Sequence, residues 1–346
     1  MNLFRHLTEH GHEQMIFSRD EATGLRAIIS IHDSSRGRAL GGVRYQSYPN
    51  EEAAVMDALR LSEAMTYKFA AAGLSYGGAK AVIIKQGEPS DRVALFRAFG
   101  RVVESLQGRF GTGEDVGTTP EDMAAIALET KHVTGLPESM GGEGDPSPVT
   151  ALGVLQGMRA GVGAVFGNDS LKGRTVAIQG LGHVGYNLAR RLHDEGARLI
   201  VSDTSNAKVQ RAVEEFGAEA MAADEIYDAA CDVFAPCALG ATLSRETIGR
   251  LRCRIVAGAA NNQLSEPLDG RLLEAKGILY LPDFVINAGG VLFLTYRLRG
   301  VTEQDAFTET EGIYHTTRRV IDISRSSQIP TSEAAFVMAR ERVKAS

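Results

Sequence analysis

Two lysines in the first third of the chain have neighbours that suggest catalytic chemistry. Lys68 lies in MTYK, near the end of a helix predicted over Glu51–Ala72, and Lys80 ends GGAK, just before a strand predicted over Ala81–Ile84. Small and apolar neighbours, or a second ammonium nearby, would lower a lysine pKa toward the range of a general base. The two lysines could therefore bind a small anion and supply a base. Alternatively, both pack their stems on the protein and keep their charges in water.

A carboxylate follows the next predicted strand. Asp115 lies in GTGEDVGTT, after a strand expected over Arg109–Thr112. Its side chain could pass protons to and from a reacting amine while balancing the lysine charge. It could instead cap the helix expected from Pro120 to about Lys131, although Thr119 stands nearer to that helix. Glu114 is a competing carboxylate, and the sequence does not choose between the two.

Paired glycines stand beside the lysine motifs. Gly41 and Gly42 follow Leu40, and Gly77 and Gly78 precede Lys80. Glycine has no side chain, so such pairs are expected where a small ligand contacts the backbone. We therefore expect a compact ligand site around these segments.

A glycine-rich turn in the second half of the chain predicts a dinucleotide site. A strand expected over Thr175–Gln179 runs directly into GLGHVG, and a helix is expected over Val184–Glu195. A second apolar run, Arg198–Ser202, ends at Asp203. In this pattern the pyrophosphate lies at the start of the helix, near His183, and the acid binds the adenosine ribose, which favours NAD over NADP. The alternative is a structural turn with a surface aspartate.

The order of these elements predicts the fold class. Strands and helices alternate regularly from residue 175 to 281, which indicates a parallel sheet covered on both faces. We expect two α/β domains: an N-terminal substrate domain over 1–136 and a Rossmann-type, doubly wound dinucleotide domain over 147–330, with an active-site cleft between them. A glycine- and proline-rich linker separates them at Thr134–Pro148, and helix 331–346 is expected to return to the first domain.

Composition indicates an ordinary soluble protein. The 346 residues are 44% hydrophobic and 23% charged, with net charge -6, which argues against nucleic acid or an anionic membrane as partner. The longest near-apolar stretch noted, Phe284–Tyr296, is too short to cross a bilayer, and no secretory signal is recognised. Three cysteines without CxxC spacing suggest reduced thiols in the cytoplasm. The histidines form no metal motif, so no metal is expected.

Several segments together resemble the amino-acid dehydrogenase family that includes the leucine, valine, phenylalanine and glutamate dehydrogenases. The similarity covers nearly the whole chain, and the motifs occur in the family's order. They are ALGGVR, MTYKFAAAG, GGAKAVI, TGEDVGTTPEDM, SPVTALGV, GLGHVG, FAPCALG, AGAANNQL and PDFVINAGGV. The resemblance implies reversible oxidative deamination of an L-amino acid to a 2-oxo acid and ammonium with NAD, by a homo-oligomer.

The resemblance also implies roles for individual residues. Lys68, Gly41 and Gly42 would bind the substrate carboxylate. Lys80 would activate water for attack on the imino intermediate, and Asp115 would exchange protons with the substrate amine. Other substrate contacts are expected at Leu40, Met65, Gly113, Asn262, Val291 and Leu294. Cofactor contacts are expected at Thr150, Gly180, Gly182, His183, Val184, Gly185, Asp203, Cys237, Ala238, Asn262 and Asn287.

The sequence disfavours one amino-acid substrate of the family but leaves several others open. In glutamate dehydrogenases a lysine precedes the paired glycines, whereas here the residue is Leu40, and Leu294 is also apolar. Burying a glutamate side chain without partners would cost several kcal/mol, so glutamate is disfavoured. Gly113 is expected to widen the pocket, as in phenylalanine or tryptophan dehydrogenases, whereas Val291 resembles the branched-chain enzymes. We expect a larger apolar substrate, leucine or phenylalanine, with tryptophan as an alternative.

Two other classes of protein stay open. A regulatory protein could bind NAD without turnover, although Lys68, Lys80 and Asp115 are all present. A hydroxy-acid dehydrogenase would need a catalytic histidine, and the C-terminal strand-end loops, which contain APCALG, AGAANNQ and PDFVINAGG, have none. Activity toward amino acids distinguishes these classes from an amino-acid dehydrogenase.

Overall fold

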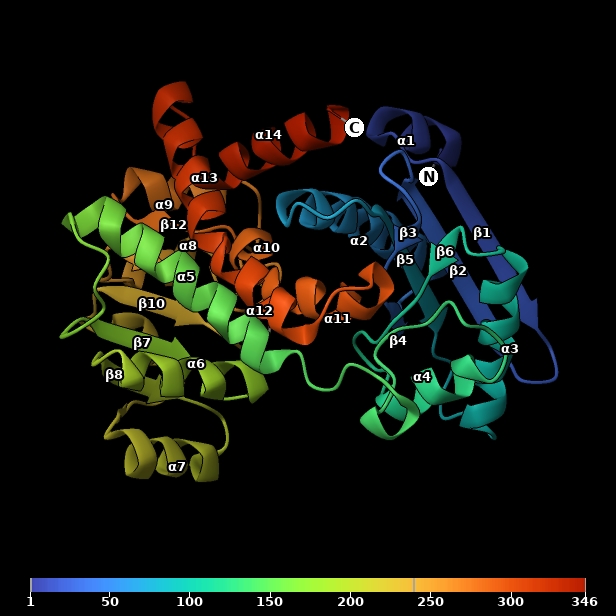
Figure 1. Ribbon diagram of the computed structural model, residues 1–346, viewed down its shortest axis with the longest axis horizontal. Coiled ribbons are helices and arrows are strands. Elements are labelled where there is room, and N and C mark those ends of the chain that lie inside the picture. Colours follow the sequence, from blue (N-terminus) through green and yellow to red (C-terminus); the bar gives the residue numbers. More distant parts are fainter. Residues whose placement is uncertain (1, 239, 346) are drawn as a thin grey trace. The chain divides into compact units, whose positions relative to one another are not determined.

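The computed structural model describes residues 2–238 and 240–345 (Figure 1). The chain forms two compact units, Met1–Gly144 with Arg340–Ser346, and Asp145–Ala339. The expected ranges 1–136 and 147–330 lie inside these units, and the boundary falls within the expected linker. The expected returning helix is α14 (Thr331–Lys344), and only its last residues belong to unit 1.

Unit 1 is built on a mixed six-stranded sheet in the order β1-β2-β5-β3-β6, with β4 paired to β5. Its strands are β1 (Gln14–Asp20), β2 (Leu25–Asp33), β3 (Ala39–Leu40), β4 (Val43–Gln46), β5 (Gly77–Ile84) and β6 (Phe110–Gly111). The pairs β1–β2 and β2–β5 are antiparallel, and the others are parallel. Strand β5 begins four residues before the predicted start, so Lys80 lies within the strand, opposite Ser30.

Helices cover both faces of this sheet. They are α1 (Leu3–His10), α2 (Glu51–Ala71), α3 (Arg92–Ser105) and α4 (Pro120–Ala127). Ala79 and Ala81 of β5 pack with α3 and α4, whereas Val82 packs with α2. Because side chains alternate along a strand, Lys80 shares the α2 face with Val82. Helix α4 starts at Pro120 with a Thr119 capping box, as expected, but it ends before the predicted Lys131.

Unit 2 contains a parallel sheet in the order β12-β11-β10-β7-β8-β9. Its strands are β7 (Thr175–Gln179), β8 (Arg198–Ser202), β9 (Glu219–Ala220), β10 (Val233–Pro236), β11 (Ile255–Val256) and β12 (Leu279–Tyr280). The chain runs outward from β7 through β8 to β9, then returns to the other side of β7 with β10. This is the doubly wound order, with its switch point between β7 and β10. The predicted α/β class and Rossmann-type unit are confirmed.

Helices and a short 3₁₀ turn surround this second sheet or extend the unit. They are α5 (Ser147–Phe166), α6 (His183–Asp194), α7 (Asn206–Phe216), η2 (Ile226–Asp228), α8 (Arg245–Arg250), α9 (Asp269–Ala275), α10 (Asp283–Ile286), α11 (Gly289–Arg299), α12 (Glu303–Glu311) and α13 (Ile313–Ser327). Another 3₁₀ turn, η1 (Glu138–Met140), lies in the linker segment and belongs to unit 1. Helix α5 is longer than the near-apolar stretch Phe284–Tyr296 of the sequence. Among the described residues, it is the one helix that is long and apolar enough to span a bilayer. Most of it is buried, as expected of a core helix, and it packs on α6, α11 and α13.

Candidate functional site in each unit

An ion pair joins the two residues of unit 1 expected to do chemistry. Lys80 Nζ lies 3.1 Å from Asp115 Oδ2. The lysine side chain is 6% exposed and the aspartate side chain 20% exposed. The competing carboxylate, Glu114, is exposed to solvent. The structure therefore distinguishes the two acids that the sequence left open.

The loop that carries Asp115 is fixed against β4. The backbone N–H groups of Val43 and Tyr45 donate to the carbonyl oxygens of Gly113 and Val116. The Thr118 hydroxyl accepts from the Asp115 N–H at 2.9 Å. These bonds extend the β4 ladder along the loop, so the carboxylate is held by the backbone on both sides.

Burial and charge act together on the pair. Burial lowers the pKa of Lys80, and this outweighs the opposing effect of the Asp115 charge. Burial alone would raise the pKa of Asp115, but the charges of Lys80 and Arg44 and their hydrogen bonds bring that pKa below its ordinary value. The pair thus combines an ionised carboxylate with a lysine that loses its proton more readily than usual.

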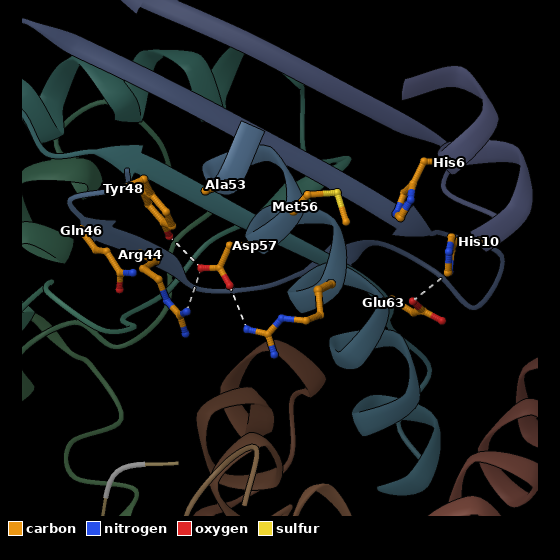
Figure 2. A pocket seen from close by; sticks show the side chains of 10 residues that line it. His6, His10, Arg44, Gln46, Tyr48, Ala53, Met56, Asp57 and Glu63 are labelled. Carbon is orange, nitrogen blue, oxygen red and sulfur yellow. Dashed lines mark hydrogen bonds and ion pairs between the residues drawn. The ribbon is translucent and has the colours of Figure 1, made fainter. Parts of the chain in front are cut away.

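Arg44 connects this pair to a second carboxylate. Its Nε donates to Asp115 Oδ2 at 2.9 Å, and its Nη1 donates to Asp57 Oδ2 at 2.9 Å. Figure 2 shows Arg44 and Tyr48 directed at Asp57, beside a hollow of about 630 Å³. The Tyr48 hydroxyl donates to Asp57 at 2.7 Å, and Arg60 donates to its other oxygen at 2.9 Å. Lys80, Asp115, Arg44 and Asp57 therefore form one continuous row of alternating charge.

The paired glycines are required by main-chain packing. A Cβ on Gly41 would lie 1.6 Å from the Ala79 carbonyl oxygen, and one on Gly42 would lie 2.6 Å from the Glu114 carbonyl oxygen. A Cβ on Gly78 would lie 2.2 Å from the Thr66 nitrogen of α2. Close approach of strands, loop and helix accounts for these glycines. Ligand contact by Gly41 and Gly42 stays a prediction.

The other expected substrate residues of unit 1 lie on the same elements. Lys68 is half-buried in the last turn of α2, and Met65 is half-buried on the same helix. Leu40 is buried in β3. A Cβ on Gly113 would meet the Thr134 hydroxyl at 2.7 Å, so the space that this glycine leaves is directed at Thr134. The expectation that Gly113 widens a pocket therefore gains no support from the direction of its Cβ.

In unit 2 the glycine turn has the geometry that its sequence predicts. Gly180 adopts φ +96°, and a Cβ there would lie 2.9 Å from the Ala238 nitrogen. A Cβ on Gly185 would lie 2.1 Å from the Gly180 carbonyl oxygen, whereas Gly182 has open space around it. The first and third glycines serve packing, and the second leaves the start of α6 accessible.

The turn and the strand ends beside it contain several more of the expected cofactor residues. Asp203, 10% exposed, accepts hydrogen bonds from the N–H groups of Leu181 and Ser205. His183 and Val184 form the first turn of α6, and the His183 side chain is exposed. Cys237 follows β10, and burial raises the pKa of its thiol to about 12, so it is a neutral thiol. All three cysteines are free thiols, as expected.

A second group of expected residues lies where α5 meets the turn between α10 and α11. A Cβ on Gly290 would lie 2.8 Å from the Thr150 hydroxyl oxygen. Asn287 is buried and donates to the Ala259 carbonyl and to Asn261 Oδ1, while its own Oδ1 is buried and has no partner among the described residues. Asn262 is exposed and adopts φ +52°. Val291 and Leu294 are half-buried on α11.

Comparison with known protein families matches nearly all of the chain. The family model described as Glu/Leu/Phe/Val dehydrogenase, dimerisation domain, matches residues 12–132. The model described as Glutamate/Leucine/Phenylalanine/Valine dehydrogenase matches residues 141–212 and 202–344. The chain belongs to the Glu/Leu/Phe/Val dehydrogenase family. The resemblance recognised in the motifs is confirmed.

Individual members of the family are similar over almost their full length. Leucine dehydrogenase of Bacillus subtilis is 52% identical over 99% of this chain and 94% of its own length. Phenylalanine dehydrogenase of Caldalkalibacillus thermarum is 45% identical over 96% of this chain and 91% of its own length. The crystal structure of L-tryptophan dehydrogenase from Nostoc punctiforme has a TM-score of 0.89 and 44% identity, covering 99% and 98% of the two chains. The protein is an oxidoreductase of the amino-acid dehydrogenase type, and its nucleotide-binding unit indicates a dinucleotide cofactor.

Sequence analysis missed Arg44, Asp57 and Tyr48. Arg44 lies inside the quoted motif ALGGVR, where a charged residue between Val43 and Tyr45 on a short strand was a usable signal. Asp57 is one of several acids on a long amphipathic helix, and nothing local separates it from a solvent-exposed residue. Among the described residues, no group of three or more His, Cys, Asp or Glu side chains is arranged to hold a metal ion.

Proposed function

We propose that this protein catalyses the reversible, NAD-dependent oxidative deamination of an apolar L-amino acid to its 2-oxo acid and ammonium. The observation that carries the proposal is the buried Lys80–Asp115 pair, in a chain that belongs to this dehydrogenase family. It combines a carboxylate and a lysine whose pKa is lowered by burial. Such a pair can take protons from both an amine and a water molecule.

The chain's own residues would manage the protons. Asp115 would accept a proton from the substrate ammonium, since only a neutral amine lets hydride leave the Cα. Lys80 would then remove a proton from the water that attacks the imino carbon. Lys68 would bind the substrate carboxylate, with the backbone of Gly41 and Gly42. When bound, NAD supplies the hydride acceptor.

The residues of unit 2 fit a dinucleotide. The open backbone at Gly182 suits a pyrophosphate at the start of α6. Asp203 is fixed by two N–H groups and would bind the ribose hydroxyls, which supports NAD because a 2′-phosphate would meet its charge. The buried, unpartnered Asn287 Oδ1 supports a nearby donor group on the ligand, such as the nicotinamide carboxamide, with the Thr150 hydroxyl close to the same turn.

The substrate is proposed to be leucine or phenylalanine. Leu40 is buried and apolar, so no side chain there would pair with a substrate carboxylate. The most similar relatives include leucine, tryptophan and phenylalanine dehydrogenases, all with apolar substrates. One methylene in an apolar pocket gives only about 1–3 kcal/mol of discrimination, so activity on several of these amino acids is expected.

Assembly and location are also proposed by analogy. The model for residues 12–132 describes a dimerisation domain, and one structural relative at 23% identity is a hetero-hexameric glutamate dehydrogenase. We propose a homo-oligomer in the cytoplasm. Sedimentation of the purified protein tests whether it is a homo-oligomer.

A panel of L-amino acids, assayed with NAD and NADP side by side, tests the proposed function. Leucine or phenylalanine with NAD is expected to generate NADH absorbance, and Asp115→Asn is expected to abolish it. Binding of NAD by calorimetry without any NADH formation would instead support a regulatory protein. Equal activity of Asp115→Asn would contradict the assigned role of the carboxylate.

A further inference from the structure

We infer that Arg44 is a positioning residue that holds Asp115 in its reactive place, and that Asp57 on α2 holds Arg44 in turn. The inference rests on the proposed function, because it concerns the same carboxylate. It is based on the row of contacts Lys80–Asp115–Arg44–Asp57, whose three contacts measure 3.1, 2.9 and 2.9 Å.

The fold places these side chains on one face of the sheet. Val43 and Tyr45 of β4 pack with α3 and α4, so Arg44 between them is directed to the α2 face. Lys80 on the neighbouring β5 shares that face. Arg44 is therefore fixed by strand register between Asp115, in the adjacent loop, and Asp57, on the helix above it.

Arg44 and Lys80 approach the same oxygen of Asp115. Both contacts are made to Oδ2, and no side chain among the described residues forms a hydrogen bond or ion pair with Oδ1. An arginine fork can hold two acceptors in fixed directions, which a lysine in the same place cannot do. Arg44 thus orients the carboxylate through one oxygen and leaves the other for a substrate amine.

The charged groups around Asp115 come from three elements. Lys80 lies on β5, Arg44 on β4, and Asp57 on α2 with Tyr48 and Arg60 as its own partners. Side chains of Arg44 and Asp57 are 14% and 13% exposed, so solvent screens their charges only partly. Removing the guanidinium charge would raise the pKa of Asp115 and also that of Lys80, whose protonated form the guanidinium opposes. Both shifts have the same direction.

The test is the pH dependence of kcat/KM for Arg44→Gln and Arg44→Lys. Arg44→Gln is expected to move the profile upward by about one pH unit, because an opposite charge at this distance lowers a carboxyl pKa by about 1–3 units. Arg44→Lys keeps the charge but loses the fork, so its profile is expected to stay near that of the wild type while kcat falls at least tenfold.

Arg97→Lys is the matched control. Arg97 forms an arginine–carboxylate pair with Glu129 in the same unit, at 2.7 Å, away from Asp115. It is expected to leave both the profile and kcat unchanged. A merely structural role for Arg44 would lower activity equally at every pH, and a profile of Arg44→Gln that superimposes on the wild type overturns the inference. Inactive Asp115→Asn with an unshifted Arg44→Gln refutes the positioning role alone, whereas a wild type that forms no NADH with any L-amino acid refutes the proposed function itself.

Discussion

The two units build their candidate sites from different materials. In unit 1 the site consists of charged side chains, Lys80, Asp115 and Arg44, brought together from a loop and two strands. In unit 2 it consists mainly of backbone, with Gly180 and Gly185 packed against neighbouring main chain and Gly182 left open. Side-chain sites depend on charge and pKa, whereas backbone sites depend on close packing.

This difference predicts which substitutions damage which property. Unit 1 should lose catalysis when a charge changes, with smaller effects on the fold. Unit 2 should lose folding stability when a methyl group is added at a packed glycine.

The largest effect is expected for Lys80→Gln. Loss of the base should lower kcat by about 10²–10⁴-fold, as for other general bases. If Lys80 and Asp115 act as a unit, Lys80→Gln combined with Asp115→Asn should be little worse than either single variant. Steady-state kinetics of the two single variants and the double variant measure this coupling. Fully multiplicative losses would show that the two residues act independently and do not form one catalytic unit.

Sequence patterns predicted the backbone site better than the side-chain site. The bounds of β7 and β8 agree with prediction, because the apolar run and the turn that ends it lie within each segment. The strand β9 is two exposed residues with no periodicity, and α1 and β1 were not assigned. The choice of Asp115 over Glu114 needed the register of the loop against β4, and the contact between Arg44 and Asp115 joins residues 71 positions apart. Contacts of this kind depend on the packing of elements rather than on local pattern.

The folding stability of unit 1 is expected to depend on pH through His12. His12 is buried, and its contact with the Leu59 carbonyl at 3.0 Å requires a protonated Nε2, which leaves Nδ1 buried without a partner among the described residues. Burial lowers the pKa of His12 to about 4 from 6.5. Because the unfolded chain binds this proton below pH 6.5 and the folded chain does not, stability present above pH 6.5 is lost as the pH falls toward 4.

The loss attributable to His12 should be at most about 3 kcal/mol. Urea unfolding at pH 7.5 and 5 measures it, and His12→Gln should reduce the difference between the two pH values. His315→Gln, at an exposed position on α13, is the matched control and should leave that difference unchanged. If the unfolding free energies of His12→Gln and the wild type depended on pH in the same way, His12 would not contribute to the loss of stability at low pH.

Substitutions at two glycines of the same turn, Gly182 and Gly185, separate packing from ligand contact within unit 2. Gly185→Ala places a methyl group 2.1 Å from the Gly180 carbonyl oxygen and should cost about 1–3 kcal/mol of folding stability. Gly182→Ala, with φ -66° and nothing within 4 Å, should change stability by less than about 0.5 kcal/mol. It should still weaken NAD binding, because its methyl group would face the phosphates. Urea unfolding with calorimetric NAD titration separates the two, and equal stability of both variants would contradict the packing role of Gly185.

The smallest effect is expected at Asp203, the one charged side chain on which the proposed cofactor preference depends. Asp203→Asn keeps an oxygen that can accept from the Leu181 N–H but removes the charge that opposes a 2′-phosphate. The ratio of kcat/KM for NAD over NADP should fall about tenfold, which corresponds to about 1.4 kcal/mol. Asp194→Asn removes an equal charge at the exposed end of α6 and should leave the ratio unchanged. If the ratio of kcat/KM for NAD over NADP were the same for Asp203→Asn and the wild type, backbone geometry alone would select the cofactor. The main chain of unit 2 would then determine cofactor specificity as well as cofactor binding.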